Sequence, residues 1–235
     1  MMAARAFASI IVAVAAVACG GAATVAVDPT AAPTTAVPTT TTPTTAAPTA
    51  PAAGALAWTV SDKSKATVRV REQLVGVNLP SDAVLTATGA KGSFTLNADG
   101  TFASGSAITF DLRTLASDSR DRDNFIKQDT LRVSQFPTAT FVPTKSTGLT
   151  LPLPASGDFA FTLTGTLTIH GKDKVVTFDV KATRSGADLT ATATANPSLK
   201  FGDFGMSAPS VNFRVVSVVD EIRLIIDLVA SGPAN

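Results

Sequence analysis

Residues 158–170 read DFAFTLTGTLTIH, and this stretch decides the fold class of the chain. Apolar side chains alternate with alanine, threonine and a final histidine along it, the apolar set being Phe159, Phe161, Leu163, Leu167 and Ile169. Because successive side chains of a β-strand point to opposite faces, this alternation is typical of an antiparallel strand with one buried face. The stretch therefore predicts a half-buried strand in an all-β protein.

The same period of two recurs on both sides of this stretch, from residue 56 almost to the end. It is clear in Val176, Phe178 and Val180 and again in Ile222, Leu224, Ile226 and Leu228. It is also present in residues 101–112, and weaker alternation covers 67–73, 84–96, 138–142 and 189–195. About eight strands joined by short turns, such as 97–100 and 170–173, predict an eight-stranded antiparallel up-and-down barrel of the lipocalin type. The interior of such a barrel holds packed side chains or one slender ligand.

Residues 118–132 break the alternation and predict a short helix. We expect Asp118 to cap its first turn, with Asp121 three residues later in an arrangement like a capping box. Phe125, Ile126 and Leu131 then form an apolar stripe, and Pro137 ends any helix. We expect this helix to lie over one mouth of the barrel.

Small residues occupy two rows that we expect to face inward: Ala191, Ala193 and Ala195 in one, and Thr86, Thr88, Ala90 and Gly92 in the other. The chain also has 13 Phe with one Trp and no Tyr, a set suited to a dry interior. We interpret the small rows as room for a ligand. The alternative is tight packing of alanine against phenylalanine in an ordinary core.

The first residues have the layout of a bacterial export signal. Arg5 precedes the apolar stretch 6–18, which is shorter than the roughly 20 residues of a membrane-spanning helix. Cys19, the single cysteine, follows at once in AVACG, which resembles a lipobox although Ala16 stands where leucine is usual. We expect 1–18 to be a signal peptide and Cys19 to be lipidated, which anchors an exported protein to the outer side of the cell membrane. Ordinary cleavage after Ala18 and secretion is the alternative.

Residues 19–55 are interpreted as the lipidated cysteine and a linker, and 56–232 as the barrel domain. From Thr24 the linker is rich in Pro, Thr and Ala and lacks aromatic residues. Such a tract cannot bury enough apolar area to order itself, so we expect it to be disordered. At about 3.1 Å per residue, some thirty residues in polyproline conformation reach up to about 90 Å.

Charge and polar residues argue against several classes of function. The net charge of +1 provides no basic stripe for nucleic acid. Asp118, Asp121 and Asp123 alternate with arginines and suit a helix start better than acid–base chemistry. His170 is the single histidine, so a hydrolytic triad or a histidine-based metal site is poorly supplied. We therefore expect no catalytic residue, no metal, no cofactor and no enzymatic activity.

Five short segments, in order, carry a resemblance to a known family. They are Trp58, RDNFI at 122–126, FPTATF at 136–141, GTLTIHG at 165–171 and LKFGDFGM at 199–206. In this order and spacing the chain resembles the YceI-like family, small extracytoplasmic barrels similar to lipocalins, from about residue 58 to 231. Phe125 stands where relatives commonly have a helix histidine, and Phe201 where they have a late arginine. The second change puts a polar head-group contact of the relatives in doubt.

The resemblance implies a binding protein that holds a polyisoprenoid chain, such as a quinone tail or a polyprenyl phosphate, inside the barrel. The alternation then nominates the lining side chains: Phe94, Phe110, Phe125, Phe141, Phe161, Leu163, Leu167 and Phe178. The alternative is a structural or interaction lipoprotein whose barrel is filled by its own side chains. The oligomeric state stays open at this point, with a homodimer as one alternative.

Overall fold

The structure is a computed structural model, and it describes residues 54–210 and 215–232. The predicted signal peptide, Cys19 and nearly all of the predicted linker lie outside these ranges. Within them, none of the helices is long and apolar enough to cross a bilayer.

Strands make up most of the described chain. They are β1 Leu56–Val60, β2 Lys65–Leu74, β3 Ser81–Ala87, β4 Lys91–Leu96, β5 Ala107–Asp111, β6 Thr138–Thr147, β7 Ser156–Ile169, β8 Lys172–Ser185, β9 Asp188–Ala195, β10 Val215–Val218 and β11 Arg223–Ser231. The helical segments are short: η1 Leu112–Thr114, α1 Arg120–Phe125, η2 Ile126–Thr130 and η3 Phe201–Phe204.

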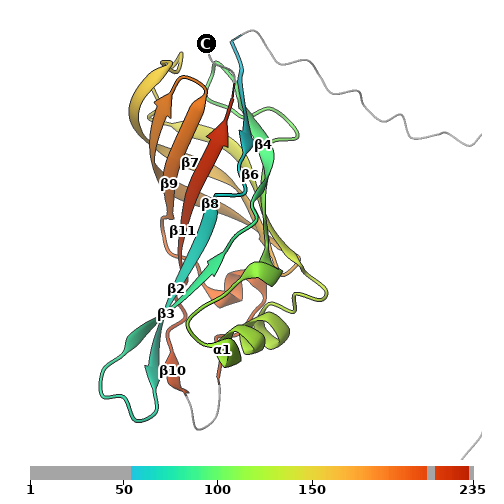
Figure 1. The fold of residues 1–235 in the computed structure, drawn as a ribbon, viewed down its shortest axis with the longest axis vertical. Coiled ribbons are helices and arrows are strands. Elements are labelled where there is room, and N and C mark those ends of the chain that lie inside the picture. The colour runs from blue at the N-terminus through green and yellow to red at the C-terminus, as the bar shows by residue number, and fades with distance from the viewer. Residues whose placement is uncertain (1–53, 211–214, 233–235) are drawn as a thin grey trace, which may run out of the picture. The chain divides into compact units, whose positions relative to one another are not determined.

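The strands close into a barrel, as Figure 1 shows. The hydrogen-bonded order β1-β4-β5-β6-β7-β8-β9-β11 returns to its start, because β11 also pairs with β1 through Val60 opposite Ala230. Every pairing in this ring is antiparallel. The prediction of a closed eight-stranded antiparallel barrel is confirmed.

Two neighbouring positions in the ring each hold two short strands in place of one long strand: β1 and β2 share the first position, and β4 and β3 share the second. Both β1 and β2 pair with β11, while β4 pairs with β1 and β3 with β2. The predicted continuous strand over 84–96 is therefore wrong in detail, since it breaks between Ala87 and Lys91, where Gly89 has a φ of +71°. This left-handed conformation is one that glycine adopts without a steric penalty. Beyond the ring, β2 also pairs with the short β10.

The hairpin of β7 and β8 forms the longest pairing in the barrel. Ile169 lies opposite Lys172, so the connecting loop is His170-Gly171, with φ angles of +52° and +68°. A two-residue loop with both φ values positive has the handedness that matches the twist of two antiparallel strands. The predicted turn at 170–173 is thus present, and it places the phenylalanines of β7 and β8 on the inner face.

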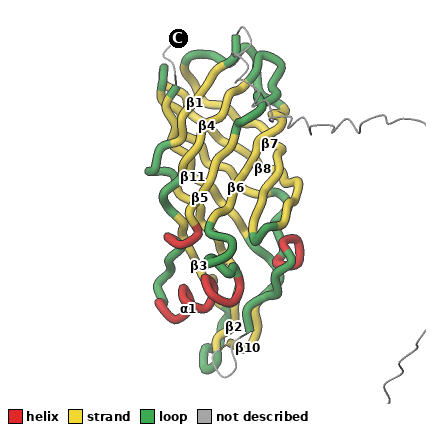
Figure 2. Tube along the Cα trace, turned by 90° about the vertical axis from the view of Figure 1, so that its right-hand side faces the viewer, coloured by secondary structure: helices red, strands yellow, loops and turns green. Residues whose placement is uncertain are grey.

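The helical segments lie together at one end of the barrel, as Figure 2 shows, which confirms the predicted helix over one mouth. We call this the helix end, and the opposite end, with turns 97–100 and 186–187 and loop 148–155, the loop end. Ser119 caps α1 by accepting from the Arg122 backbone N–H, so the predicted cap at Asp118 is wrong by one residue. Asp118 instead pairs with the Arg122 guanidinium through its side chain.

Candidate functional site

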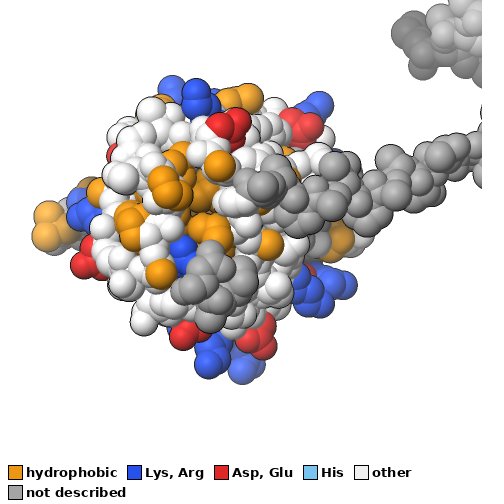
Figure 3. All heavy atoms as spheres, turned by 90° about the horizontal axis from the view of Figure 1, so that it is seen from above, with side chains coloured by type: hydrophobic (Ala, Val, Ile, Leu, Met, Phe, Trp, Pro, Cys, Tyr) orange, Lys and Arg blue, Asp and Glu red, His pale blue; other side chains and the backbone are white. Residues whose placement is uncertain are grey.

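An apolar cavity of about 90 Å³ lies inside the loop-end half of the barrel. Its lining comes from β1, β4 to β9, β11, loop 148–155 and Phe102 between β4 and β5, and every lining side chain is apolar. Figure 3 views the protein from this end, and hydrophobic side chains gather in the middle of the face, within a rim of polar atoms. Such a cavity offers dispersion and desolvation to an apolar chain and few hydrogen bonds.

Aromatic rings build much of the cavity wall. Trp58 stacks on Phe94 with 5.5 Å between ring centroids, and Phe141 meets Phe178 edge to face at 5.2 Å. The Phe141 ring lies against Gly165, where an added Cβ would come within 2.5 Å of it. The glycine of the GTLTIHG segment is therefore what leaves room for this ring.

The row of small residues on β9 has the predicted orientation. Ala191 and Ala193 both line the cavity, and their partners on β11, Leu228 and Ile226, have larger side chains. The predicted orientation of Thr86 and Thr88 is wrong, because Ala83, Leu85 and Ala87 are the buried set on β3. Thr86 therefore points outward, and Thr88 lies beyond the end of the strand.

The eight side chains predicted to line the ligand site lie in three different places. Phe94, Phe141, Phe161, Leu163 and Phe178 line the cavity. Phe110 and Leu167 are buried in the core outside the cavity lining, and Phe125 lines a separate cleft at the helix end. Alternation identifies the inner face of a strand but not the depth at which a side chain lies along the barrel.

Several lining residues were not nominated. Trp58 is one, although the alternation of Leu56, Trp58 and Val60 marks the inner face of β1. Leu149 and Leu153 are two more, and they come from an irregular loop in which no period signals their orientation.

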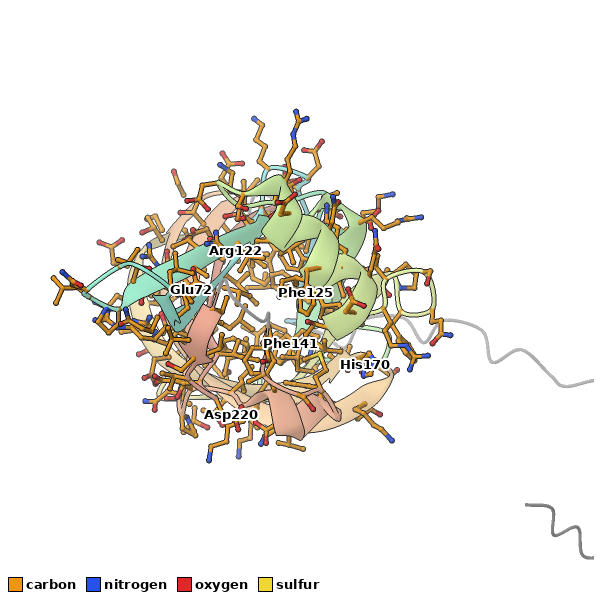
Figure 4. The ribbon with its side chains drawn as sticks, turned by 90° about the horizontal axis from the view of Figure 1, so that it is seen from below. Glu72, Arg122, Phe125, Phe141, His170 and Asp220 are labelled. Atoms are coloured by element: carbon orange, nitrogen blue, oxygen red, sulfur yellow. The ribbon has the colours of Figure 1, made fainter. Side chains whose placement is uncertain are left out.

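The cleft at the helix end, which we call the helix-end cleft, has a volume of about 520 Å³ and differs in character. It lies between α1, η2, β2, β3 and β10 and includes Glu72 and Arg122. Arg122 Nη2 donates to Glu72 Oε1 at 2.7 Å, and the Glu72 side chain is only 8% exposed. Figure 4 shows Arg122 on α1 next to Glu72, with Phe125 on the same helix. This ion pair ties α1 to β2.

His170 and Asp203 each have contacts within the fold. The His170 Nδ1 lies 3.2 Å from the Phe204 carbonyl oxygen, and its ring packs edge to face on Phe136. Asp203 accepts from the Lys200 backbone N–H at 2.9 Å and pairs with Lys174, which holds the pKa of Asp203 below its ordinary value. Among the described residues, no three His, Cys, Asp or Glu side chains are grouped as metal ligands.

Comparisons with known proteins agree with this architecture. The sequence model of the YceI-like domain matches residues 58–230. A UPF0312 protein of Pseudomonas putida is 32% identical over 120 residues, which cover 48% of this chain and 59% of the relative, so the match spans little over half of that protein.

One solved structure is similar in fold, and a second superposes less closely. A polyisoprenoid-binding domain from Saccharophagus degradans, implicated in plant cell wall breakdown, superposes with a TM-score of 0.55 at 13% identity, over 76% of this chain and 99% of that one. BcnA of Burkholderia cenocepacia has a TM-score of 0.48 at 19% identity, over 72% and 97% of the two chains. At these identities the likeness to the first concerns the fold.

Proposed function

The chain belongs to the family of YceI-like domains, and from this premise we propose that its barrel binds a long apolar lipid of the isoprenoid type, such as a polyprenyl chain or a quinone tail. The observation that carries the proposal is the cavity in the loop-end half, whose lining is wholly apolar. The similar domain from Saccharophagus degradans is itself polyisoprenoid-binding, which supports the same class of ligand.

The energetics of such a complex are favourable. Burial of several hundred Å² of apolar chain at about 25 cal/mol per Å² contributes on the order of 10 kcal/mol before the cost of association. Affinity then comes from the length of tail that is buried, and few polar contacts are needed. Binding and carriage require no catalytic group, which agrees with the contacts of His170 and Asp203 within the fold.

The cavity must widen to accept a long tail. Its volume of about 90 Å³ is below the several hundred Å³ that are usual for small-molecule sites. Phe159, Phe161 and Leu163 of β7 line it and are only partly buried, so a change of rotamer in these side chains adds space. The same small volume favours the second candidate function, a structural or interaction protein with a filled barrel.

Analysis of copurifying lipid distinguishes the two candidates. The full chain is expressed in a bacterial host, purified without detergent and extracted, and the extract is analysed by mass spectrometry. We expect a polyprenyl or quinone species in near-stoichiometric amount. Absence of lipid, together with no uptake of added polyprenol by the purified protein, would support the filled barrel.

We further propose that the protein is exported and held at the outer face of the cell membrane by lipid on Cys19, with 19–55 as a tether to the barrel domain 56–232. The support is the short apolar stretch 6–18 directly before the single cysteine. Cys19→Ser should release the protein from the membrane fraction and leave its unfolding midpoint unchanged. Wild-type protein that is soluble with an unmodified Cys19 would establish secretion instead.

A further inference from the structure

A buried arginine lies at the loop end of the apolar cavity. Alternate residues of β8 face inward in the order Val176, Phe178, Val180, Ala182 and Arg184, and the row from Phe178 to Ala182 lines the cavity. Arg184 continues this row toward the loop end and is only 1% exposed.

The guanidinium of Arg184 has neutral partners. Its Nε donates to the Gly186 carbonyl at 3.0 Å, and its Nη1 lies 3.1 Å from the Pro154 carbonyl oxygen and 3.3 Å from that of Leu153. The guanidinium carbon lies over the Trp58 ring, 5.4 Å from its centroid. Within 54–210 and 215–232, no carboxylate forms an ion pair with Arg184.

Two buried donors at this position lack an acceptor. In the part of the chain that the structure describes, neither Nη2 of Arg184 nor Nε1 of Trp58 has a hydrogen-bond partner, and both are buried. A buried donor without an acceptor is unfavourable, and a buried charge without a counter-charge more so. The bonds to loop 148–155 account for Nη1 and the bond to Gly186 accounts for Nε, but neither explains Nη2. The positive charge and an unpaired N–H on each of two side chains in contact are groups that suit an oxyanion.

We propose that Arg184 and Trp58 bind the oxyanion of a single-chain amphiphile, a carboxylate or a phosphate, whose apolar tail occupies the cavity. The assignment rests on the proposed function and adds the charge and orientation of the ligand. The flat guanidinium presents its remaining N–H groups to an oxyanion, and such charge-assisted hydrogen bonds are strong where water is excluded. Trp58 and Leu153 line the cavity and also contact or bond Arg184, so head and tail sites adjoin. A neutral head group leaves the buried charge uncompensated.

Three probes with the same tail test the head group: hexadecanol, palmitate and hexadecyl phosphate. Each displaces a fluorescent lipid from the full chain, below its critical micelle concentration. We expect at least one anionic probe to bind about tenfold or more tightly than hexadecanol, a preference worth about 1.4 kcal/mol. The probe that gains most tells whether a carboxylate or a phosphate is preferred.

Variants on β8 tie the preference to this residue. Arg184→Gln should remove the anionic preference and leave hexadecanol binding unchanged, while Arg184→Lys should keep part of the preference. Lys181→Gln, on the same strand but exposed, is the matched control and should behave as wild type.

The outcomes separate the two levels of the proposal. Equal affinity of the wild-type protein for all three probes overturns the oxyanion site without any variant and leaves the apolar cavity as the binding site. Binding of none of them overturns the proposed function and the oxyanion site with it. An anionic preference that survives in Arg184→Gln overturns the role of Arg184.

Discussion

Strand β7 passes through both halves of the barrel, and its inward side chains differ between them. Toward the loop end, Phe159, Phe161 and Leu163 are only partly buried and line the cavity. Toward the helix end, Gly165 and Leu167 on the same face are buried. One alternating pattern therefore builds both a hollow half and a filled half.

The two halves differ in packing because different irregular segments fold into the two ends of the barrel. Segments between the strands supply Leu131, Leu199 and Phe204 to the core, all buried, with Phe204 at 0% exposure. Phe204 belongs to η3, which packs on β8 at the helix end. The loop end receives loop 148–155, whose Leu149 and Leu153 reach the cavity wall. Strands define the interior, and the irregular segments decide how much of it is filled.

The largest effect should come from truncating the filled half. Phe204→Ala is expected to lower the free energy of unfolding by about 3–5 kcal/mol, because it opens a void in a closed core. Phe161→Ala, beside space that already exists, should cost only about 1 kcal/mol. Urea denaturation of both variants provides the comparison. Equal losses at the two positions would mean that the loop-end half is packed as densely as the other.

Breaking the buried ion pair at the helix-end cleft should have an intermediate effect. Glu72→Gln leaves the Arg122 guanidinium with a weaker partner and should cost about 1–3 kcal/mol. Lipid binding at the loop end should be retained, since the helix-end cleft is a separate site. Arg113→Gln, which removes an exposed pair with Asp111, is the control and should show no measurable change. Loss of lipid binding in Glu72→Gln, with binding retained in Arg113→Gln, would indicate that the head group binds at the helix end.

The smallest effect concerns pH at the helix end. Lys174 lowers the pKa of Asp203 in the folded state. The negative charge of Asp203 therefore stabilises the fold when the pH is above the pKa of this carboxyl group in the unfolded chain, about 3.9. This stabilisation is lost as the pH falls through the lower, folded pKa. Asp203→Asn can still accept from Lys200, so the difference between the two proteins reports the charge. Urea midpoints should differ at neutral pH, approach one another as the pH falls below about 4, and converge once it is below the pKa of the folded state. Parallel curves at all pH values would contradict the assignment.

Much of the fold follows from local patterns in the sequence, because a strand period and a turn such as His170-Gly171 depend on neighbouring residues only. The level at which an inward side chain lies along the barrel axis depends on residues distant in sequence. The alternation therefore could not distinguish Phe110 and Leu167, which lie outside the cavity lining, from Phe141 and Phe161, which belong to it. Arg184 escaped notice for a related reason. It occupies an inward position of β8, but a charged side chain carries no apolar signal for the inner face.

The most direct test of a hollow, adaptable loop-end half is Ala193→Phe. Ala193 lines the cavity from β9, opposite Val180 of β8. Copurifying lipid and the unfolding midpoint are measured together in wild type and variant. If the space holds a lipid tail, the wild-type protein carries lipid, and the variant folds but carries none, since the new ring fills the slot. If the barrel is solid, the wild-type protein carries no lipid and the variant is destabilised by about 1–3 kcal/mol through overpacking.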